Sequence, residues 1–370
     1  MSSHTIKIII SGGGTGGHVF PAISIANELK RVGERIDILF VGASGRMEME
    51  RVPAAGYDIE GLPVRGFHRK NVYKNIMVLY YLVLSMIMAR RIINRFRPDV
   101  VVGVGGYASG PVVRVASMTG IPVLIQEQNS YAGVTNRILA RKAARICVAY
   151  EGMEKYFPAG KIVITGNPVR QDILNLSGKR NEALSRFGID GDKKVILVLG
   201  GSLGAESLNR AISGSISKIR EAGLALIWQT GTRGIDDAKE TIKRDGSKEV
   251  QVYEFISRMD LAYAVADIVI SRAGAGTISE LAVTGKASIL VPSPNVAEDH
   301  QTRNAMSLAG RNAALLVKDH ECGTKLVPLA INLARDPERR AELEKNITGM
   351  AVSDSAARIA AEIMNLVKKE

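Results

Sequence analysis

The sequence predicts an α/β protein built from two Rossmann-like, doubly wound halves that face a cleft, and three observations lead to this fold class. Short apolar runs of strand type alternate with longer segments of helical period over most of the 370 residues, a pattern typical of parallel sheets covered by helices. The alternation stops at a polar stretch, residues 171–194, and then restarts. A glycine-rich loop follows the first strand of each half.

The first half contains five apolar runs that are predicted strands. The first run leads into the loop GGGTGGH, residues 12–18, and then into a helix. We expect this helix to begin near Pro21, because a proline ring suits a first helical turn. The predicted strands are residues 6–10, 36–41, 100–104, 122–125 and 145–149.

The second half repeats the pattern, which sets the expected domain boundaries. Its first strand leads into the loop GGSLGA, residues 200–205. We expect an N-terminal domain of residues 1–169 and a C-terminal domain of residues 170–352. A last helix, about residues 353–370, has an apolar face and could cover either domain, including a return to the first. The predicted strands are residues 195–199, 225–228, 250–253, 268–270 and 287–291.

The net charge of +12 raises the question of nucleic-acid binding, so the position of the charge matters more than its size. Residues 1–170 carry 22 Lys and Arg against 11 Asp and Glu, whereas residues 171–370 carry 27 against 26.

The two cysteines, Cys147 and Cys322, lie far apart, which favours neither a disulfide framework nor a metal cluster and suits a reducing cytoplasm. The N-terminus lacks the residue order of a signal peptide.

An apolar run at residues 76–89, IMVLYYLVLSMIMA, lies within the acid-free and strongly basic segment 61–98. Its 14 residues fall short of the roughly 20 that a membrane-spanning helix needs. A buried core helix is the ordinary alternative for such a run, but the basic flanks favour a helix lying on an anionic membrane leaflet. A nucleic-acid module would place aromatic residues among the basic ones on a stacking platform. Tyr73, Tyr80 and Tyr81 do occur near the charges, but in an apolar helix, so no nucleic-acid partner is expected.

The first glycine loop has a spacing that also occurs in dinucleotide sites. Gly12, Gly14 and Gly17 follow a strand, and such a turn presents backbone N–H groups to a phosphate. A dinucleotide site also needs an acid at the end of the second strand. That strand ends at Gly42 without one, and Glu48 comes too late. No nucleotide cofactor is therefore expected at this loop.

A second glycine loop, residues 103–107, follows another strand of the same half. Paired loops suit a diphosphate, although either loop alone is equally consistent with a tight turn. His18 stands where the first loop meets its helix. The helix dipole would keep the imidazole neutral and able to accept a proton. The alternative is a histidine that only hydrogen-bonds the loop.

In the second half, the segment SRAGAGTISE, residues 271–280, follows a strand and leaves two roles open for Glu280. With Thr277 it fits a capping box, in which both side chains satisfy N–H groups at a helix start. Its carboxylate would equally well accept the two hydroxyls of a ribose. Asp190 and Asp192 precede a strand, the wrong end for a ligand site of this fold, and are predicted to lie in a solvated turn.

Seven motifs, each modest alone, occur in an order and spacing that resemble one family. They are similar to the MurG family of UDP-N-acetylglucosamine transferases, which make lipid II for bacterial peptidoglycan and belong to the two-domain GT-B glycosyltransferases. The resemblance covers nearly the whole chain. The motifs are GGGTGGH (12–18), GVGGYASGP (103–111), QEQNSYAGVTNR (126–137), GNPVR (166–170), GGSLGA (200–205), SRAGAGTISE (271–280) and DHQTRNA (299–305).

The resemblance implies an inverting transferase that moves GlcNAc from UDP-GlcNAc to the MurNAc 4-hydroxyl of lipid I, an undecaprenyl-diphosphate-linked acceptor, without a metal or a cofactor. It implies that His18 is the candidate general base. The acceptor diphosphate would be held by Gly14, Gly105, Gly106 and Tyr107. The donor would be bound by Thr15, Gly16, Gly17, Asn129, Arg170, Ser202, Ile256, Ala275, Gly276, Thr277, Glu280 and Gln301.

Within the implied donor set, each part of UDP-GlcNAc has its own residues. Arg170 and Ser202 would hold the diphosphate, against which residues 275–277 would also lie. Ile256 would meet the uracil and Glu280 the ribose hydroxyls. The GlcNAc sugar would be addressed by Asn129 and Gln301.

The resemblance also implies a peripheral enzyme on the cytoplasmic face of the cell membrane. Two departures from the family pattern stand on the N-terminal side. Gln126 replaces the usual His, and residues 65–71 lack the RGKG-like run, so no acceptor contact is assigned there. The alternatives are a GT-B enzyme acting on diacylglycerol or a small aglycone, and a basic nucleic-acid-binding protein.

Overall fold

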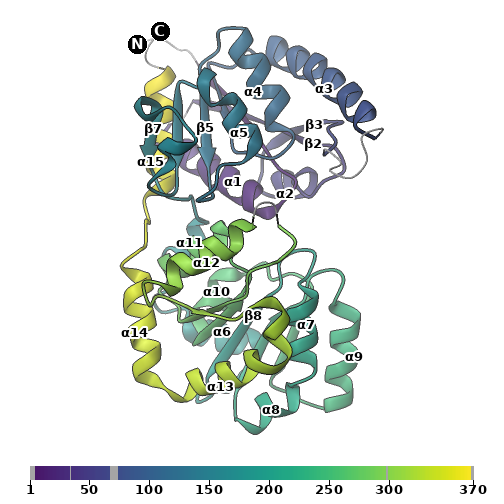
Figure 1. The fold of residues 1–370 in the computed structure, drawn as a ribbon, viewed down its shortest axis with the longest axis vertical. Coiled ribbons are helices and arrows are strands. Elements are labelled where there is room, and N and C mark those ends of the chain that lie inside the picture. The colour runs from purple at the N-terminus through teal and green to yellow at the C-terminus, as the bar shows by residue number, and fades with distance from the viewer. Residues whose placement is uncertain (1–4, 34, 67–73, 297–298, 368–370) are drawn as a thin grey trace. The chain divides into compact units, whose positions relative to one another are not determined.

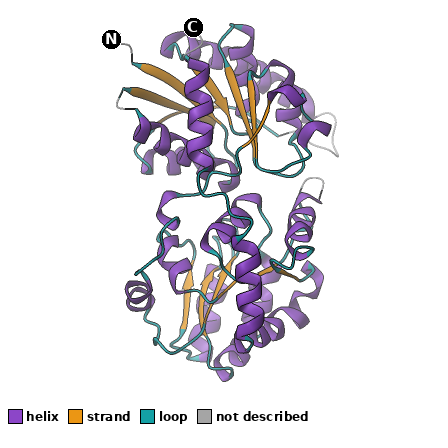
Figure 2. Cartoon of the chain, turned by 90° about the vertical axis from the view of Figure 1, so that its left-hand side faces the viewer, coloured by secondary structure: helices purple, strands orange, loops and turns teal. Residues whose placement is uncertain are grey.

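The computed structural model describes residues 5–33, 35–66, 74–296 and 299–367, which fall into two compact units. Unit 1 comprises Met1–Arg170 together with Ser353–Glu370, and unit 2 comprises Gln171–Val352. In each unit a sheet of strands lies between layers of helices (Figures 1 and 2). Arg69 and Lys70, two basic residues of the acid-free segment, lie outside the described residues.

The sheet of unit 1 has seven strands among the described residues, and all neighbouring strands are parallel. They are β1 (Ile6–Ser11), β2 (Ile36–Ala43), β3 (Asp58–Leu62), β4 (Val100–Gly103), β5 (Val123–Glu127), β6 (Arg145–Val148) and β7 (Ile162–Ile164). The order is β3-β2-β1-β4-β5-β6-β7. Because the order reverses between β1 and β4, the loops after these strands meet at the carboxyl edge, where doubly wound folds bind ligands.

Helices cover both faces of this sheet because its strands alternate their apolar side chains between two cores. Ile8 and Ile10 pack into one core with α1, α2 and α15, and Ile9 packs into the other with α3, α4 and α5. Ile359 and Ile363 of α15, both fully buried, fill the first core beside α1. The helices are α1 (Gly16–Val32), α2 (Glu48–Ala54), α3 (Lys74–Phe96), α4 (Ser109–Met118), α5 (Val134–Leu139) and α15 (Ser355–Val367).

Helix α1 begins at Gly16, so the predicted start near Pro21 is wrong. The N–H groups of His18 and Val19 both donate to the Thr15 carbonyl oxygen, at 3.0 and 3.2 Å, so the helix already forms at the loop glycines. Pro21 lies inside the helix, where its missing N–H leaves the Gly17 carbonyl without the usual donor. His18 consequently lies in the first turn of α1.

Helix α3 packs one face on unit 1 and exposes an apolar face. Ala89 and Ile93 are buried against the sheet. By length and composition, residues Ile76–Phe96 could cross a membrane, and 28% of their 18-residue apolar stretch is buried. The expectation that this segment is too short to span is therefore wrong, because the helix continues past the apolar run. The large apolar side chains exposed on α3 are Ile76, Met77, Leu79, Tyr80, Val83 and Ile87.

Unit 2 has a six-stranded parallel sheet among the described residues, in the order β10-β9-β8-β11-β12-β13. Its strands are β8 (Val195–Leu199), β9 (Ala225–Gln229), β10 (Val250–Tyr253), β11 (Ile268–Ser271), β12 (Ser288–Leu290) and β13 (Leu315–Leu316). Its helices are α6 (Arg180–Phe187), α7 (Glu206–Ser213), α8 (Ile216–Glu221), α9 (Ile235–Asp245), α10 (Met259–Val265), α11 (Ala275–Thr284), α12 (His300–Ala309), α13 (Val327–Arg335) and α14 (Pro337–Thr348).

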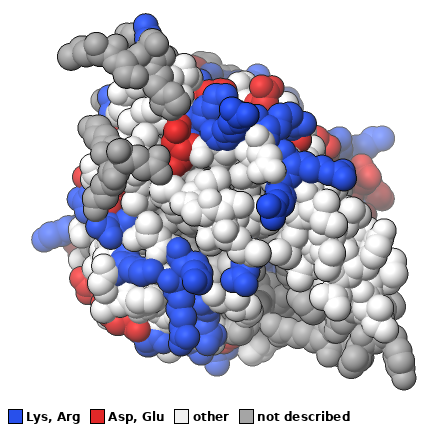
Figure 3. Space-filling model, turned by 90° about the horizontal axis from the view of Figure 1, so that it is seen from above, with Lys and Arg blue, Asp and Glu red and all other residues white. Residues whose placement is uncertain are grey.

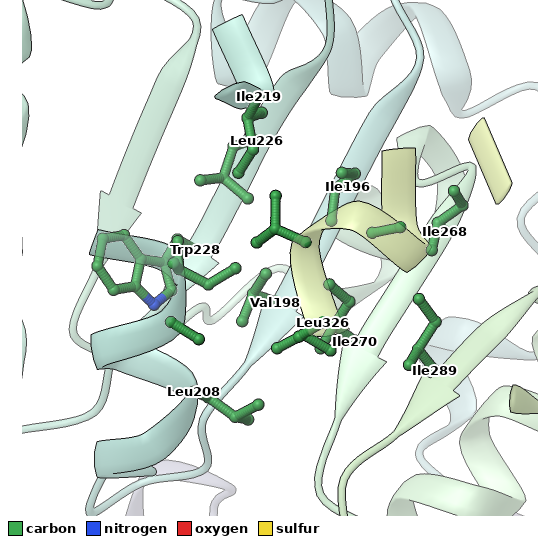
Figure 4. Close-up of a cluster of buried hydrophobic side chains, with 14 of the residues drawn as sticks. Ile196, Val198, Leu208, Ile219, Leu226, Trp228, Ile268, Ile270, Ile289 and Leu326 are labelled. Atoms are coloured by element: carbon green, nitrogen blue, oxygen red, sulfur yellow. The ribbon is translucent and has the colours of Figure 1, made fainter. Parts of the chain in front are cut away.

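A core of aliphatic side chains and one tryptophan holds the sheet of unit 2 to its helices (Figure 4). Val198, Leu226 and Trp228 are fully buried in it. Burying each such side chain contributes about 1.5–3 kcal/mol to the free energy of folding. The Trp228 indole N–H donates to the Asn209 side-chain oxygen on α7 at 3.1 Å. This core therefore fixes the helices that follow β8 and β9.

Candidate functional site

The two glycine loops of unit 1 are in direct contact, as their positions after β1 and β4 predict. A Cβ atom added at Gly12 would lie 2.2 Å from Val104, and one at Gly106 would lie 2.3 Å from the Gly13 carbonyl oxygen. Only glycine allows this approach. Gly105 and Gly106 also have φ angles of +94° and +83°, which favour glycine. The two loops therefore form one continuous backbone surface at the carboxyl edge of the sheet.

His18 lies against the second loop and is held by the first. A Cβ atom added at Gly105 would come within 3.0 Å of the His18 Nε2 atom. Nδ1 of His18 is 3.2 Å from the Thr15 hydroxyl oxygen. If Nδ1 carries the proton and donates to Thr15, Nε2 is the ring nitrogen that can accept a proton. This arrangement brings together His18, Thr15 and Gly105 from the predicted site.

A buried carboxylate, Glu48, occupies the inner side of the first loop. Its two oxygens accept the N–H groups of Gly14 and Ala43, each at 2.9 Å, and the residue is 1% exposed. A Cβ atom at Gly13 would lie 2.1 Å from the carboxylate. Gly13 therefore makes room for Glu48. In the sequence, Glu48 lies too far beyond the second strand to bind a nucleotide ribose. No sequence pattern indicated that its carboxylate contacts the first glycine loop.

Gly14 and Tyr107 present their outer sides to solvent. A Cβ atom at Gly14 would meet nothing within 4 Å, and Tyr107 is 57% exposed. The Gly14 N–H is already used by Glu48. A ligand at this loop would therefore approach the open Cα side of Gly14 and the first turn of α1, where N–H groups lack helical partners.

Glu127, at the end of β5, fixes the loop that contains Asn129. Its carboxylate accepts the Asn129 and Gly133 N–H groups at 3.0 and 2.9 Å, and the Asn136 side-chain nitrogen at 2.9 Å. Burial raises the pKa of Glu127, and these donors oppose that rise. A carboxylate with so many donors holds residues 129–136 in one conformation. Sequence reasoning assigned no role to Glu127.

Gln126, where the resembled family usually has His, belongs to a buried amide network. Its Nε2 donates to the Asn167 side-chain oxygen at 3.2 Å, and its side-chain oxygen accepts from Gln128. Gln128 also donates to the Val104 carbonyl at 2.7 Å, and Asn167 donates to the Gln128 carbonyl at 3.0 Å. The network joins the segments that follow β4, β5 and β7. A neutral amide there gives these loops a connection that does not titrate.

In unit 2, the loop after β8 packs closely on the loop after β9. A Cβ atom at Gly204 would lie 2.4 Å from the Thr230 carbonyl oxygen. The Ser202 carbonyl accepts the Thr232 N–H at 3.1 Å, and the Ser202 side chain is exposed. Asn209 fastens the second loop by donating to the Thr230 carbonyl at 3.0 Å. These contacts fix where the Ser202 hydroxyl is presented.

Glu280 does not form the capping box that its spacing with Thr277 allowed. Helix α11 begins at Ala275 after the N-cap residue Gly274, and no side chain caps it, so Thr277 is too far into the helix to act as the cap. The Glu280 carboxylate instead accepts the Tyr263 hydroxyl at 2.9 Å. The capping-box role is therefore wrong, and the ribose role stays a prediction.

The remaining predicted donor residues of unit 2 lie at the same edge of its sheet. Ala275, Gly276 and Thr277 form the first turn of α11, where N–H groups have no helical partner, and a Cβ atom at Gly276 would meet nothing within 4 Å. Ile256 is buried, and its N–H donates to the Gln229 side chain at 3.0 Å. The Gln301 side-chain oxygen accepts the Ser293 N–H at 2.9 Å.

The structure also places Arg170 and the Asp190 and Asp192 pair. Arg170 belongs to unit 1, one residue before the change to unit 2, and its guanidinium lies 5.2 Å from the centre of the Phe20 ring. The Asp190 and Asp192 pair is exposed in a turn before β8. The prediction of a solvated turn is confirmed.

Comparisons with known proteins match both units. The family models of the glycosyltransferase family 28 N-terminal and C-terminal domains match residues 8–148 and 195–359. A UDP-N-acetylglucosamine–N-acetylmuramyl-(pentapeptide) pyrophosphoryl-undecaprenol N-acetylglucosamine transferase from Parabacteroides distasonis is 55% identical over 364 residues, covering 98% of this chain and 99% of the relative. A transferase of the same name from Bacteroides fragilis is 55% identical over 366 residues, covering 98% and 96%.

A solved structure gives the same match in three dimensions. The crystal structure of Acinetobacter baumannii MurG aligns with a TM-score of 0.75 at 28% identity, covering 97% of this chain and 99% of that one. The two chains thus share their fold over nearly their whole length.

Proposed function

The chain belongs to glycosyltransferase family 28, and on this premise we propose that it moves GlcNAc from UDP-GlcNAc to the MurNAc 4-hydroxyl of lipid I, giving lipid II for peptidoglycan. The observation that carries the proposal is the identity of 55% across 98% of the chain with a transferase named for this reaction. The contacts of the predicted residues support it.

Unit 2 supplies most of the proposed donor contacts. Glu280 accepts the ribose hydroxyls, and Ile256 contacts the uracil. The Ser202 hydroxyl and the first turn of α11, residues 275–277, bind the diphosphate, because their N–H groups and hydroxyls suit an anion. Gln301 addresses the sugar through its amide nitrogen, since its oxygen is held by Ser293. Unit 1 adds proposed donor contacts at Thr15, Gly16, Gly17, Asn129 and Arg170.

Unit 1 binds the acceptor in this proposal. The acceptor diphosphate contacts the joined loops at Gly14, Gly105, Gly106 and Tyr107. His18 Nε2 takes the proton of the 4-hydroxyl as the oxygen attacks the anomeric carbon of GlcNAc. The bond from that carbon to the phosphate oxygen breaks with inversion, and UDP leaves with the bonding electrons. Arg170 and helix N-termini stabilise the leaving diphosphate.

The proposed reaction needs no metal ion. Arg170 and the helix N-termini would supply the positive charge that the leaving diphosphate needs. The decisive experiment is transfer of labelled GlcNAc from UDP-GlcNAc to a lipid I analogue in the presence of EDTA, with diacylglycerol as the competing acceptor. We expect transfer to lipid I alone and undiminished by EDTA. Transfer to diacylglycerol would show another GT-B activity, and loss with EDTA would show that a metal is required.

We also propose that unit 1 binds the cytoplasmic leaflet of the cell membrane through the exposed apolar face of α3. Helix α3 is a packed part of the unit, which favours a helix lying on the membrane over one crossing it. Lys and Arg side chains lie beside uncharged surface on the face seen from above (Figure 3), as binding to anionic lipid requires. A nucleic-acid partner is not proposed, because this surface is apolar rather than a stacking platform.

The membrane proposal predicts the effect of one added charge. Val83→Glu is expected to weaken binding to vesicles containing anionic phospholipid by about tenfold, because it places a carboxylate in the apolar contact. Val32→Glu on α1 is a matched control, since both valines are 51% exposed. Vesicle sedimentation measures both. Transfer to a water-soluble acceptor analogue should not change, and equal vesicle binding by the two variants would contradict the proposal.

A further inference from the structure

The donor side of unit 2 contains a fully buried tyrosine, Tyr263, whose side-chain hydroxyl contacts Glu280. Tyr263 on α10 is 0% exposed, and its hydroxyl donates to Glu280 Oε2 on α11 at 2.9 Å. A buried phenol hydroxyl needs a partner, but a backbone carbonyl would satisfy it. Here the partner is the carboxylate that the proposed function assigns to the ribose.

Helix α10, which holds Tyr263, is itself firmly anchored. The Asp260 carboxylate in its first turn accepts three hydrogen bonds, two from Arg258 and one from the Lys179 ammonium, each at 2.9 Å. The hydrogen bond from Arg258 holds the pKa of Asp260 well below its usual range, and Lys179 adds to this effect. Hydrogen bonds between charged groups are roughly twice as strong as those between neutral groups. The tyrosine hydroxyl is therefore presented from a fixed position.

We propose that Tyr263 is a positioning residue for nucleotide recognition, because its hydroxyl sets the plane of the Glu280 carboxylate. The last torsion of a glutamate side chain is broad, so an unrestrained carboxylate samples many planes. To accept two adjacent ribose hydroxyls at once, the carboxylate must be held in one particular plane. The same helix begins just after the segment of Ile256, so α10 connects the proposed uracil contact with the proposed ribose contact. The inference rests on the proposed role of Glu280.

The test compares binding of UDP with binding of 2′,3′-dideoxy-UDP, which lacks both ribose hydroxyls. Tyr263→Phe removes one oxygen and keeps the buried ring. We expect it to weaken UDP binding by about tenfold, the size of one hydrogen bond to a charged group, and to leave 2′,3′-dideoxy-UDP binding unchanged. In a Glu280→Gln background, adding Tyr263→Phe should have no further effect on UDP. Isothermal titration calorimetry measures all of these affinities.

Two outcomes would overturn the inference in distinguishable ways. If Glu280→Gln lowers the preference for UDP over the dideoxy compound but Tyr263→Phe weakens both ligands equally, the ribose role stands and the positioning role fails. If Glu280→Gln leaves the preference intact, the proposed ribose contact fails and the inference fails with it. Tyr253→Phe is the matched control, since Tyr253 packs edge-on against Phe187 in the same unit and should keep wild-type affinities for both ligands.

Discussion

Replacing His18 by alanine is expected to lower the turnover number by about 10²–10⁴-fold, the range for a positioned general base, with the Kd for UDP-GlcNAc near its wild-type value. The imidazole acts on the acceptor hydroxyl, so its loss removes an interaction of the transition state rather than of the bound donor. Single-turnover transfer to a lipid I analogue measures the first quantity. Calorimetry with UDP-GlcNAc measures the second.

A second histidine gives the control for this experiment. His320 is exposed in unit 2, and His320→Ala should retain full turnover. Gly105→Ala should also lower turnover, because its methyl group would lie within 3.0 Å of His18 Nε2 and would strain the loop at a φ angle of +94°. Full turnover in His18→Ala would remove His18 from the mechanism, whatever its position in the loop.

The Glu48→Gln variant should lose stability and acceptor binding together. A glutamine oxygen can accept only one of the two N–H groups that Glu48 now accepts, and its amide nitrogen would face the other. One buried unpaired N–H costs about 1–3 kcal/mol in the free energy of unfolding, which corresponds to a fall in the Tm of unit 1 of roughly 2–12 °C. Scanning calorimetry measures the shift.

The kinetics of Glu48→Gln show whether the first glycine loop serves the acceptor more than the donor. Because Gly14 would be held less firmly, we expect the KM for the lipid acceptor to rise by more than the KM for UDP-GlcNAc, most of whose proposed contacts lie in unit 2. Glu50→Gln on the same helix is the control, since Glu50 is exposed. A Tm and acceptor KM equal to those of Glu50→Gln would show that the loop keeps its shape without the buried carboxylate.

Central strands could be predicted from the sequence, and three edge strands could not. The ten predicted strands are present, with bounds that differ by at most two residues. The missed strands are β3, β7 and β13, each at one end of a sheet. Their residues are mostly only half-buried. β3 has no continuous apolar run, whereas β7 (IVI) and β13 (LL) are apolar but only three and two residues long, shorter than the runs of four to eight residues that identify a strand.

The roles of the loop residues were predictable only in part. Motif spacing placed the two glycine loops in one half of the chain, and the strand order brings them into contact. Motif spacing could not show why residue 13 must be glycine. The reason is the Glu48 carboxylate, which reaches the loop from α2. Nor could motif spacing choose between the two roles of Glu280. The capping box is excluded by where α11 starts, and the Glu280 contact with Tyr263 comes from a different helix.

Helix α15 has a consequence for how the protein is made. Because its residues follow all of unit 2 in the chain yet fill the core of unit 1, unit 2 is an insertion within unit 1. During synthesis, which proceeds from the N-terminus, unit 2 can complete its core before Ile359 and Ile363 leave the ribosome. The N-terminal unit, although synthesised first, keeps an apolar groove beside α1 open until the last helix arrives, so its folding finishes last.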